Sequence, residues 1–155
     1  MRAPGPLTRA GAVAAIVLAA DQVTKAIVRS SLGPDAVRHL LPGIKLVHEQ
    51  NSGVAFSLLT GSEAGVIVIT LIVVTAVLVF FARHRARAWM WLACGLIVGG
   101  AFGNLIDRVR AGSVTDFVKL PDWPAFNLAD SAITLGVVAL FLIVGFGSGP
   151  AARTA

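Results

Sequence analysis

The sequence predicts an all-α polytopic membrane protein with four transmembrane helices and a small extracytoplasmic β-sheet. Of its 155 residues, 56% are hydrophobic and 14% are charged, and the mean hydropathy is +0.82. A soluble domain is about 45–50% apolar and about 25% charged. Four apolar segments are long enough to cross a bilayer core of roughly 30 Å, which takes about 20 helical residues. The charged residues, in addition, are divided unequally between the segments that connect them.

The four apolar segments predict helices over about residues 10–28, 64–82, 88–106 and 131–147, within one membrane domain of residues 1–155. Only the first contains charged residues, Asp21 and Lys25. Its small residues also resemble the end of a cleavable secretory signal, but Leu18 suits the −3 position of such a site poorly. We therefore expect an uncleaved first helix.

The segment after the first helix predicts the small sheet. Val37–Leu41 and Ile44–Val47 are short runs of mixed apolar and polar residues, separated by a Pro42-Gly43 turn. Gly33-Pro34-Asp35 is a further turn signal just before them. Two short runs bounded by such turns are typical of paired strands.

The distribution of charge predicts the orientation in the membrane. Both termini and the loop between the second and third helices carry six basic residues and no acid. The external segments, about 29–63 and 107–130, together with the adjoining helix ends, carry seven basic residues and all eight acids. The positive-inside rule then puts both termini and the Arg83–Arg87 loop in the cytoplasm. The basic excess thus reflects topology, and nucleic acid is not an expected partner because these residues do not form a basic patch with aromatic side chains.

Polar residues gather at the predicted outer ends of the helices, where ionisable groups at membrane depth are candidates for function. Asp21 and Lys25 are four residues apart and share a helix face, so we expect an internal ion pair in a supporting role. Asn51 and Gly53 belong to a polar stretch with two interpretations. It is either a turn that leads into the second helix or exposed backbone that holds an extended peptide.

The end of the third helix combines glycines with polar side chains. Three glycines fall within residues 99–103, and glycine costs about 1 kcal/mol relative to alanine inside a helix. Their presence indicates close approach of another helix or of a ligand. Asn104 and Arg108 share a face, and Asp107 is expected to pair with a neighbouring base.

Asp116 and Asp130 are candidates for a catalytic pair. Each also has a purely structural interpretation: Asp116 as a solvated loop acid, and Asp130 as the capping partner of Asn127. Two adjacent carboxylates share a proton, because both cannot ionise cheaply. The ionised group can take a proton from water while the other donates to a carbonyl, which hydrolyses an amide. The helix N-terminus favours charge on Asp130 and thus a role as the base, but the sequence leaves open which acid holds the shared proton.

Other chemistries lack the necessary residues. His48-Glu49 begins a zinc-peptidase pattern that no second histidine completes, so no metal or other cofactor is expected. The alternative function is a small proton-coupled membrane transporter component, and a scaffold is a third class. A proton path needs acids staggered through the membrane, whereas here all acids lie at or beyond the predicted outer ends.

Five polar blocks, in their order along nearly the whole chain, resemble the bacterial lipoprotein signal peptidase (signal peptidase II) family. The blocks are Asp21-Gln22-x-x-Lys25, Asn51-x-Gly53-x-Ala55-Phe56, Gly99-Gly100-Ala101-x-Gly103-Asn104-x-x-Asp107-Arg108, Val114-x-Asp116-Phe117 and Phe126-Asn127-x-Ala129-Asp130. This family consists of aspartic peptidases of the inner membrane. They remove signal peptides from prolipoproteins whose cysteine carries a diacylglyceryl group.

The resemblance implies that Asp116 and Asp130 are the catalytic pair and that no cofactor is required. It also implies a set of residues that support the site or bind substrate: Asp21, Lys25, Asn51, Gly53, Asn104, Asp107, Arg108 and Asn127. The implied partners are a diacylglyceryl prolipoprotein and membrane lipid. We expect a monomer in the bacterial cytoplasmic (inner) membrane, with its active site near the outer surface.

Overall fold

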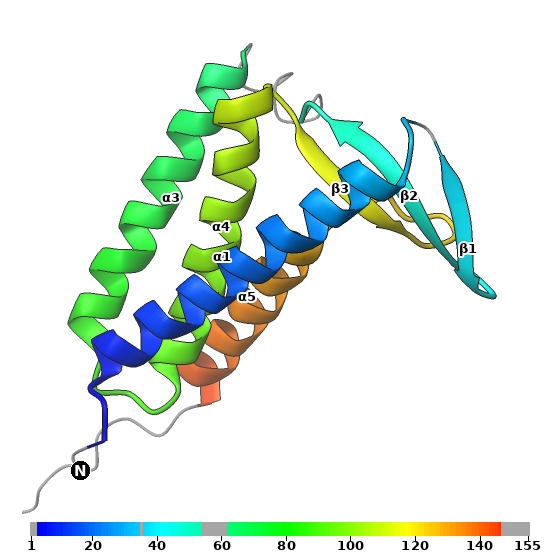
Figure 1. Ribbon diagram of the computed structural model, residues 1–155. Helices are drawn as coiled ribbons and strands as arrows, with labels where there is room; N and C mark the ends of the chain where they lie inside the picture. Colours follow the sequence, from blue (N-terminus) through cyan, green and yellow to red (C-terminus); the bar gives the residue numbers. More distant parts are fainter. Residues whose placement is uncertain (1–2, 35, 54–61, 147–155) are drawn as a thin grey trace, which may run out of the picture.

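The computed structural model describes residues 3–34, 36–53 and 62–146, which form long helices and a small sheet (Figure 1). In chain order the elements are α1 (Pro6–Ser31), β1 (Val37–Leu41), β2 (Ile44–Asn51), α3 (Glu63–His84), α4 (Met90–Ala111), β3 (Val114–Lys119) and α5 (Leu128–Phe146). Within the described residues, four helices are long and apolar enough to cross a membrane. The predicted fold class is therefore confirmed.

Several helices extend beyond their apolar segments, and α1 exceeds the predicted residues 10–28 at both ends. Helix α4 continues to Ala111 instead of ending near Ile106, and α5 begins at Leu128 instead of Ser131. The added turns carry polar side chains that bond within the protein, so the helices continue where the hydropathy falls. Asp35 of the expected turn and residue 147 of the fourth predicted helix lie outside the described residues.

Helix α4 is the centre of the bundle. It packs against α1, α3 and α5 and is mostly buried, whereas few residues of the other three helices are fully buried. A Cβ at Gly99 would lie 2.7 Å from the carbonyl oxygen of Ala14 on α1, and one at Gly100 would lie 2.5 Å from that of Ala129 on α5. Small residues let helix backbones approach closely in lipid. The predicted close approach is thus made by the two neighbouring helices.

The exposed faces of the outer helices are apolar. Ile16 on α1, Ile72 on α3 and Phe141 on α5 are each more than 60% exposed. Apolar surface of this extent is unfavourable in water and ordinary in lipid. The faces that surround α4 therefore suit a bilayer environment.

The sheet lies at one end of the bundle, beside the C-terminal ends of α1 and α4 (Figure 1). Its strand order is β1-β2-β3, and both pairs are antiparallel. Strands β1 and β2 confirm the predicted pair, although β2 continues to Asn51. The third strand is an addition, since the sequence indicates only an external segment there. Strand β3 is rich in β-branched and aromatic residues, which favour strands, and it places Asp116 opposite Glu49 of β2.

Candidate active site

Asn127 contacts both acids of the candidate catalytic pair. Asp116 lies on β3, and Asp130 lies in the first turn of α5. The Nδ2 of Asn127 donates to Oδ1 of Asp116 at 2.7 Å, and its backbone nitrogen donates to Oδ2 of Asp130 at 3.1 Å. Two carboxylates from different elements are thereby held against one fully buried residue, one by its side chain and the other by its backbone.

The capping arrangement expected at the start of α5 is present. The Oδ1 of Asn127 accepts from the backbone nitrogen of Asp130 at 2.9 Å, while Asp130 accepts from the backbone nitrogen of Asn127. This reciprocal pair satisfies two N–H groups of the helix end. Capping occupies only the oxygen of the Asn127 amide, however, and leaves its nitrogen to contact Asp116.

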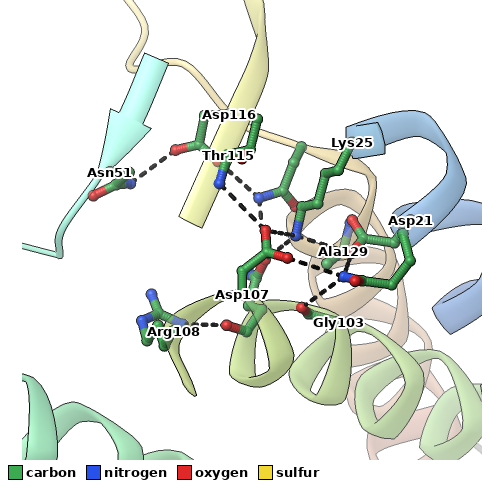
Figure 2. Close-up of polar contacts among 12 residues, drawn as sticks. Asp21, Lys25, Asn51, Gly103, Asp107, Arg108, Thr115, Asp116 and Ala129 are labelled. Carbon is green, nitrogen blue, oxygen red and sulfur yellow. Dashed lines mark hydrogen bonds and ion pairs between the residues drawn. The ribbon is translucent and has the colours of Figure 1, made fainter. Parts of the chain in front are cut away.

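The end of β2 supplies the second contact of Asp116. The Nδ2 of Asn51 donates to Oδ2 of Asp116 at 2.8 Å (Figure 2). The Oδ1 of Asn51 accepts from the backbone nitrogen of Gly53 at 2.8 Å. Gly53 has a φ of 71°, where a side chain is strained, and a Cβ there would lie 4.0 Å from Nη2 of Arg108. This glycine therefore lets the chain turn close to Arg108.

The environment of Asp116 changes its protonation. The residue is only 2% exposed. The net effect raises the pKa of Asp116 to about 6: burial is the largest cause and the charge of Asp130 adds to it, while the hydrogen bonds from Asn51 and Asn127 and the charge of Lys25 oppose the rise. A carboxyl group with this pKa can hold or release a proton near neutral pH.

A buried polar cluster lies behind the pair. Lys25 and Asp21 on α1 are both fully buried. The Nζ of Lys25 lies 2.9 Å from Oδ2 of Asp21 and 3.1 Å from Oδ2 of Asp107 (Figure 2). The ion pair expected between Asp21 and Lys25 is thus confirmed. Asp107 also has its expected basic partner, which is Lys25.

Asn104 joins this cluster to the candidate catalytic pair. Its Oδ1 accepts from Nζ of Lys25 at 2.9 Å and from Nδ2 of Asn127 at 3.1 Å. Its Nδ2 donates to Oδ1 of Asp130 at 2.7 Å. Hydrogen bonds therefore run without a break from α1 through α4 to the first turn of α5 and to β3.

A cavity of about 260 Å³ opens beside Asp130, between α3, α4 and α5. Asn104, Arg108 and Asp130 form its polar end, and aliphatic side chains of the three helices form most of the remainder. The Nε of Arg108 is buried and has no hydrogen-bond partner among the described residues. The cavity thus combines apolar walls with a guanidinium and a carboxylate at its polar end.

Sequence reasoning missed two members of the polar cluster. The Nη1 of Arg29 donates to Oγ1 of Thr115 at 3.1 Å and lies 3.8 Å from Oδ1 of Asp107. The backbone nitrogen of Thr115 donates to Oδ2 of Asp107 at 3.3 Å. Arg29 follows Lys25 by four residues, so the spacing that places Asp21 and Lys25 on one face of the helix also predicts Arg29 on that face. These bonds fix β3, and with it Asp116, against α1 and α4.

The site offers paired carboxylic acids as its reactive groups. Across residues 3–34, 36–53 and 62–146, no three His, Cys, Asp or Glu side chains are grouped as metal ligands. The only cysteine, Cys94, is buried in the helix bundle. The geometry therefore suits proton transfer between two carboxyl groups, a water molecule and a carbonyl.

Comparisons with known proteins agree with this site. A family model described as Signal peptidase (SPase) II matches residues 13–146. The chain is 40% identical over 134 residues to the lipoprotein signal peptidase of Halothermothrix orenii, covering 84% of this chain and 90% of that one. It is 42% identical over 130 residues to that of Syntrophomonas wolfei, covering 83% and 87%. A solved bacterial membrane enzyme is 28% identical with a TM-score of 0.85, covering 100% of this chain and 98% of its own. The resemblance inferred from the five polar blocks is confirmed, and the chain belongs to the signal peptidase II family.

Proposed function

We propose that this protein is a membrane aspartic endopeptidase that removes signal peptides from diacylglyceryl-modified prolipoproteins, cleaving before the lipidated cysteine. Family membership supports the reaction and the class of substrate. The aspartic mechanism rests on one observation, the contact of Asn127 with both Asp116 and Asp130. The transporter alternative gains no support from the comparisons.

The environments of the two acids suggest different roles. Asp116 is buried with a raised pKa and holds the shared proton. Asp130 receives two N–H donors at the N-terminus of α5, a position that suits a charged carboxylate. Asp130 takes a proton from water as the oxygen attacks the scissile carbonyl, and Asp116 donates its proton to the carbonyl oxygen. Collapse of the tetrahedral intermediate returns a proton to Asp116 and delivers the other, from Asp130, to the leaving nitrogen.

The cavity beside Asp130 is proposed to bind the signal peptide near the scissile bond. Its aliphatic walls suit apolar side chains, and the guanidinium of Arg108, which lines the cavity, can donate to a backbone carbonyl of an extended peptide. The acyl chains of the substrate remain in lipid beside the exposed faces of the helices. Substrate then reaches the carboxyl pair from within the membrane.

The charge distribution supports the proposed orientation. Residues 1–155 form one membrane domain, which acts as a monomer in the bacterial cytoplasmic membrane with both termini in the cytoplasm. The basic Arg83–Arg87 loop then lies inside. Asp116 lies on the sheet at the opposite end of the bundle from this loop, and thus near the outer surface (Figure 1).

Purified protein in detergent or liposomes, given a diacylglyceryl-modified precursor and the same precursor without lipid, tests the proposal. We expect cleavage directly before the cysteine of the lipidated precursor only. A precursor with serine in place of that cysteine is the matched control and remains intact. Absence of cleavage would contradict the function, and equal cleavage of the unlipidated form would contradict the substrate class.

A further inference from the structure

We infer that Lys25 is a positioning residue that fixes the amide orientation of Asn104, and through it that of Asn127, so that both carboxylates of the pair face N–H donors. The inference rests on the proposed function, because only there do Asp116 and Asp130 perform chemistry. It is carried by the contacts of Lys25 and Asn104, which reach the pair from a different helix.

Lys25 can only donate hydrogen bonds. Its ammonium group has three N–H donors and no acceptor, and each has a partner: Asp21 at 2.9 Å, Asp107 at 3.1 Å and Oδ1 of Asn104 at 2.9 Å. Because Lys25 is fully buried, no solvent competes for these positions. The oxygen of the Asn104 amide must therefore face Lys25.

That requirement determines the rest of the chain of hydrogen bonds. With its oxygen toward Lys25, Asn104 turns its nitrogen to Oδ1 of Asp130. A flipped amide would set N–H groups against the ammonium and oxygen against the carboxylate, two repulsive contacts in place of two attractive ones. The oxygen of Asn104 also accepts from Nδ2 of Asn127, whose other contact is Oδ1 of Asp116. Together with the cap at Oδ1 of Asn127, one cation thus orients donors toward both acids.

Asp21, the ion-pair partner of Lys25, holds the same assembly at a second point. Its Oδ1 accepts from the backbone nitrogen of Ala129 at 3.0 Å, next to Asp130 in the first turn of α5. A Cβ at Gly103 would lie 2.5 Å from Oδ2 of Asp21, so α4 lies directly against this carboxylate. The Asp21–Lys25 ion pair on α1 therefore sets the position of the first turn of α5, which carries Asp130. It also sets the orientation of the Asn104 amide that faces Asp130.

Loss of Lys25 has a defined electrostatic consequence. Charged and titratable groups face the two acids from every neighbouring element: Asp21, Lys25 and Arg29 from α1, Glu49 from β2, Asp107 and Arg108 from α4, Lys119 from β3 and the two acids themselves. Without the ammonium, Asn104 can turn its nitrogen to the carboxylates behind it and leave Asp130. Fewer donors on the pair disfavour its charged forms, so the pH profile of cleavage moves to higher pH.

Two double variants separate the donor from the charge. The variants are Asp21→Asn/Lys25→Met and Asp21→Asn/Lys25→Gln. Each removes one negative and one positive charge, and in each Asp107 keeps the nearby cation Arg29. Methionine and glutamine are similar in size, but only glutamine retains an N–H donor for Asn104. Steady-state cleavage of a lipidated precursor from pH 5 to 9 gives kcat and KM, and thermal unfolding in detergent gives stability.

We expect the methionine variant to have a kcat at least about tenfold below that of the glutamine variant, the effect of one lost hydrogen bond. KM should change little, and the profile of the methionine variant should lie at higher pH. Equal kcat values and equal pH profiles at equal unfolding temperatures would overturn the inference. Wild-type protein in the same assay distinguishes failure of the positioning role from failure of the proposed function. Absence of wild-type cleavage counts against the proposed function.

Asn104→Asp keeps the test decisive if the methionine variant does not fold. The new carboxylate still pairs with Lys25, but it presents oxygen to Asp130 in place of the N–H donor. We expect the same loss of kcat with little change in KM. Wild-type kcat in this variant would overturn the inference.

Discussion

At the scale of single residues, the protonation of Asp116 is controlled by a few identifiable neighbours. Burial raises the pKa of Asp116 to about 6, and the hydrogen bond from Asn51 opposes this rise. The N–H group of Asn51 stabilises the charged carboxylate, so removing it favours the protonated form. Because the proposed reaction needs a proton on Asp116, activity is expected to fall as the pH rises through this pKa.

Asn51→Leu should move this high-pH fall in activity, the basic limb of the pH profile, to higher pH by roughly half to one unit. A shift of that size corresponds to the loss of a hydrogen bond of about 1 kcal/mol. The measurement is kcat/KM against pH, which reports the free enzyme. Gln50→Leu replaces the neighbouring amide on β2, whose oxygen accepts from Ser113 instead, and should leave the limb in place. A limb that stays or moves to lower pH in Asn51→Leu would contradict the role assigned to Asn51.

The sequence predicts which residues belong to the site better than it predicts which of them contact one another. Helical spacing places Asp21 beside Lys25, and the structure confirms this pair. The bond from Arg29 to Thr115 joins residues far apart in the chain, and no local pattern encodes it. Likewise, capping predicts the oxygen contact of Asn127, whereas the use of its nitrogen depends on how β3 packs.

At the scale of elements, the active site depends on the close packing of α4 against α1 and α5. A Cβ at Gly100 would lie 2.5 Å from the carbonyl oxygen of Ala129. The carbonyl oxygen belongs to the backbone of α5 and cannot rotate away as a flexible side chain can. An added Cβ would therefore displace α5 from α4. Asp130 lies one residue after Ala129, and the movement would separate it from Asn104.

Gly100→Ala should therefore lower both stability and activity. An overpacked helix contact costs about 1–3 kcal/mol, so we expect a lower unfolding temperature in detergent and reduced cleavage. Gly11→Ala on α1 is the matched control, because a Cβ there meets nothing within 4 Å. Equal unfolding temperatures for the two variants would show that the α4–α5 contact is looser than described.

Apolar run length predicts the helices because each spanning segment must satisfy its own backbone hydrogen bonds in lipid. It cannot locate the ends of α4 and α5, where polar side chains bond to other elements and extend the helices. Strand β3 shows the same limit. Its β-branched residues are compatible with a strand, but only pairing with β2 makes Val114–Lys119 one.

At the scale of the whole molecule, charge and composition predict how the chain crosses the membrane. The six basic residues at the termini and in the Arg83–Arg87 loop, with no acid among them, favour a cytoplasmic location. The sheet lies at the other end of the bundle (Figure 1). How the sheet docks on α1 and α4 could not be predicted, because that contact depends on long-range polar bonds such as Arg29 to Thr115.

Cysteine labelling tests this orientation. In a Cys94→Ala background, a membrane-impermeant maleimide should label His39→Cys in intact spheroplasts, because His39 is exposed on β1. Ala86→Cys, exposed in the loop between α3 and α4, should react only after the membrane is permeabilised. The reverse pattern of labelling would invert the proposed topology.

Asp116 and Asp130 are proposed to cleave the lipidated precursor together, and the cleavage rates of single variants test this role. Asp116→Asn and Asp130→Asn keep the size of each side chain and remove its acid–base function, so each should lower kcat by about 10²–10⁴-fold. Asp122→Asn, an exposed acid in the same external segment, should cleave at the wild-type rate. Wild-type cleavage by folded Asp116→Asn or Asp130→Asn would exclude a catalytic carboxyl pair at these positions.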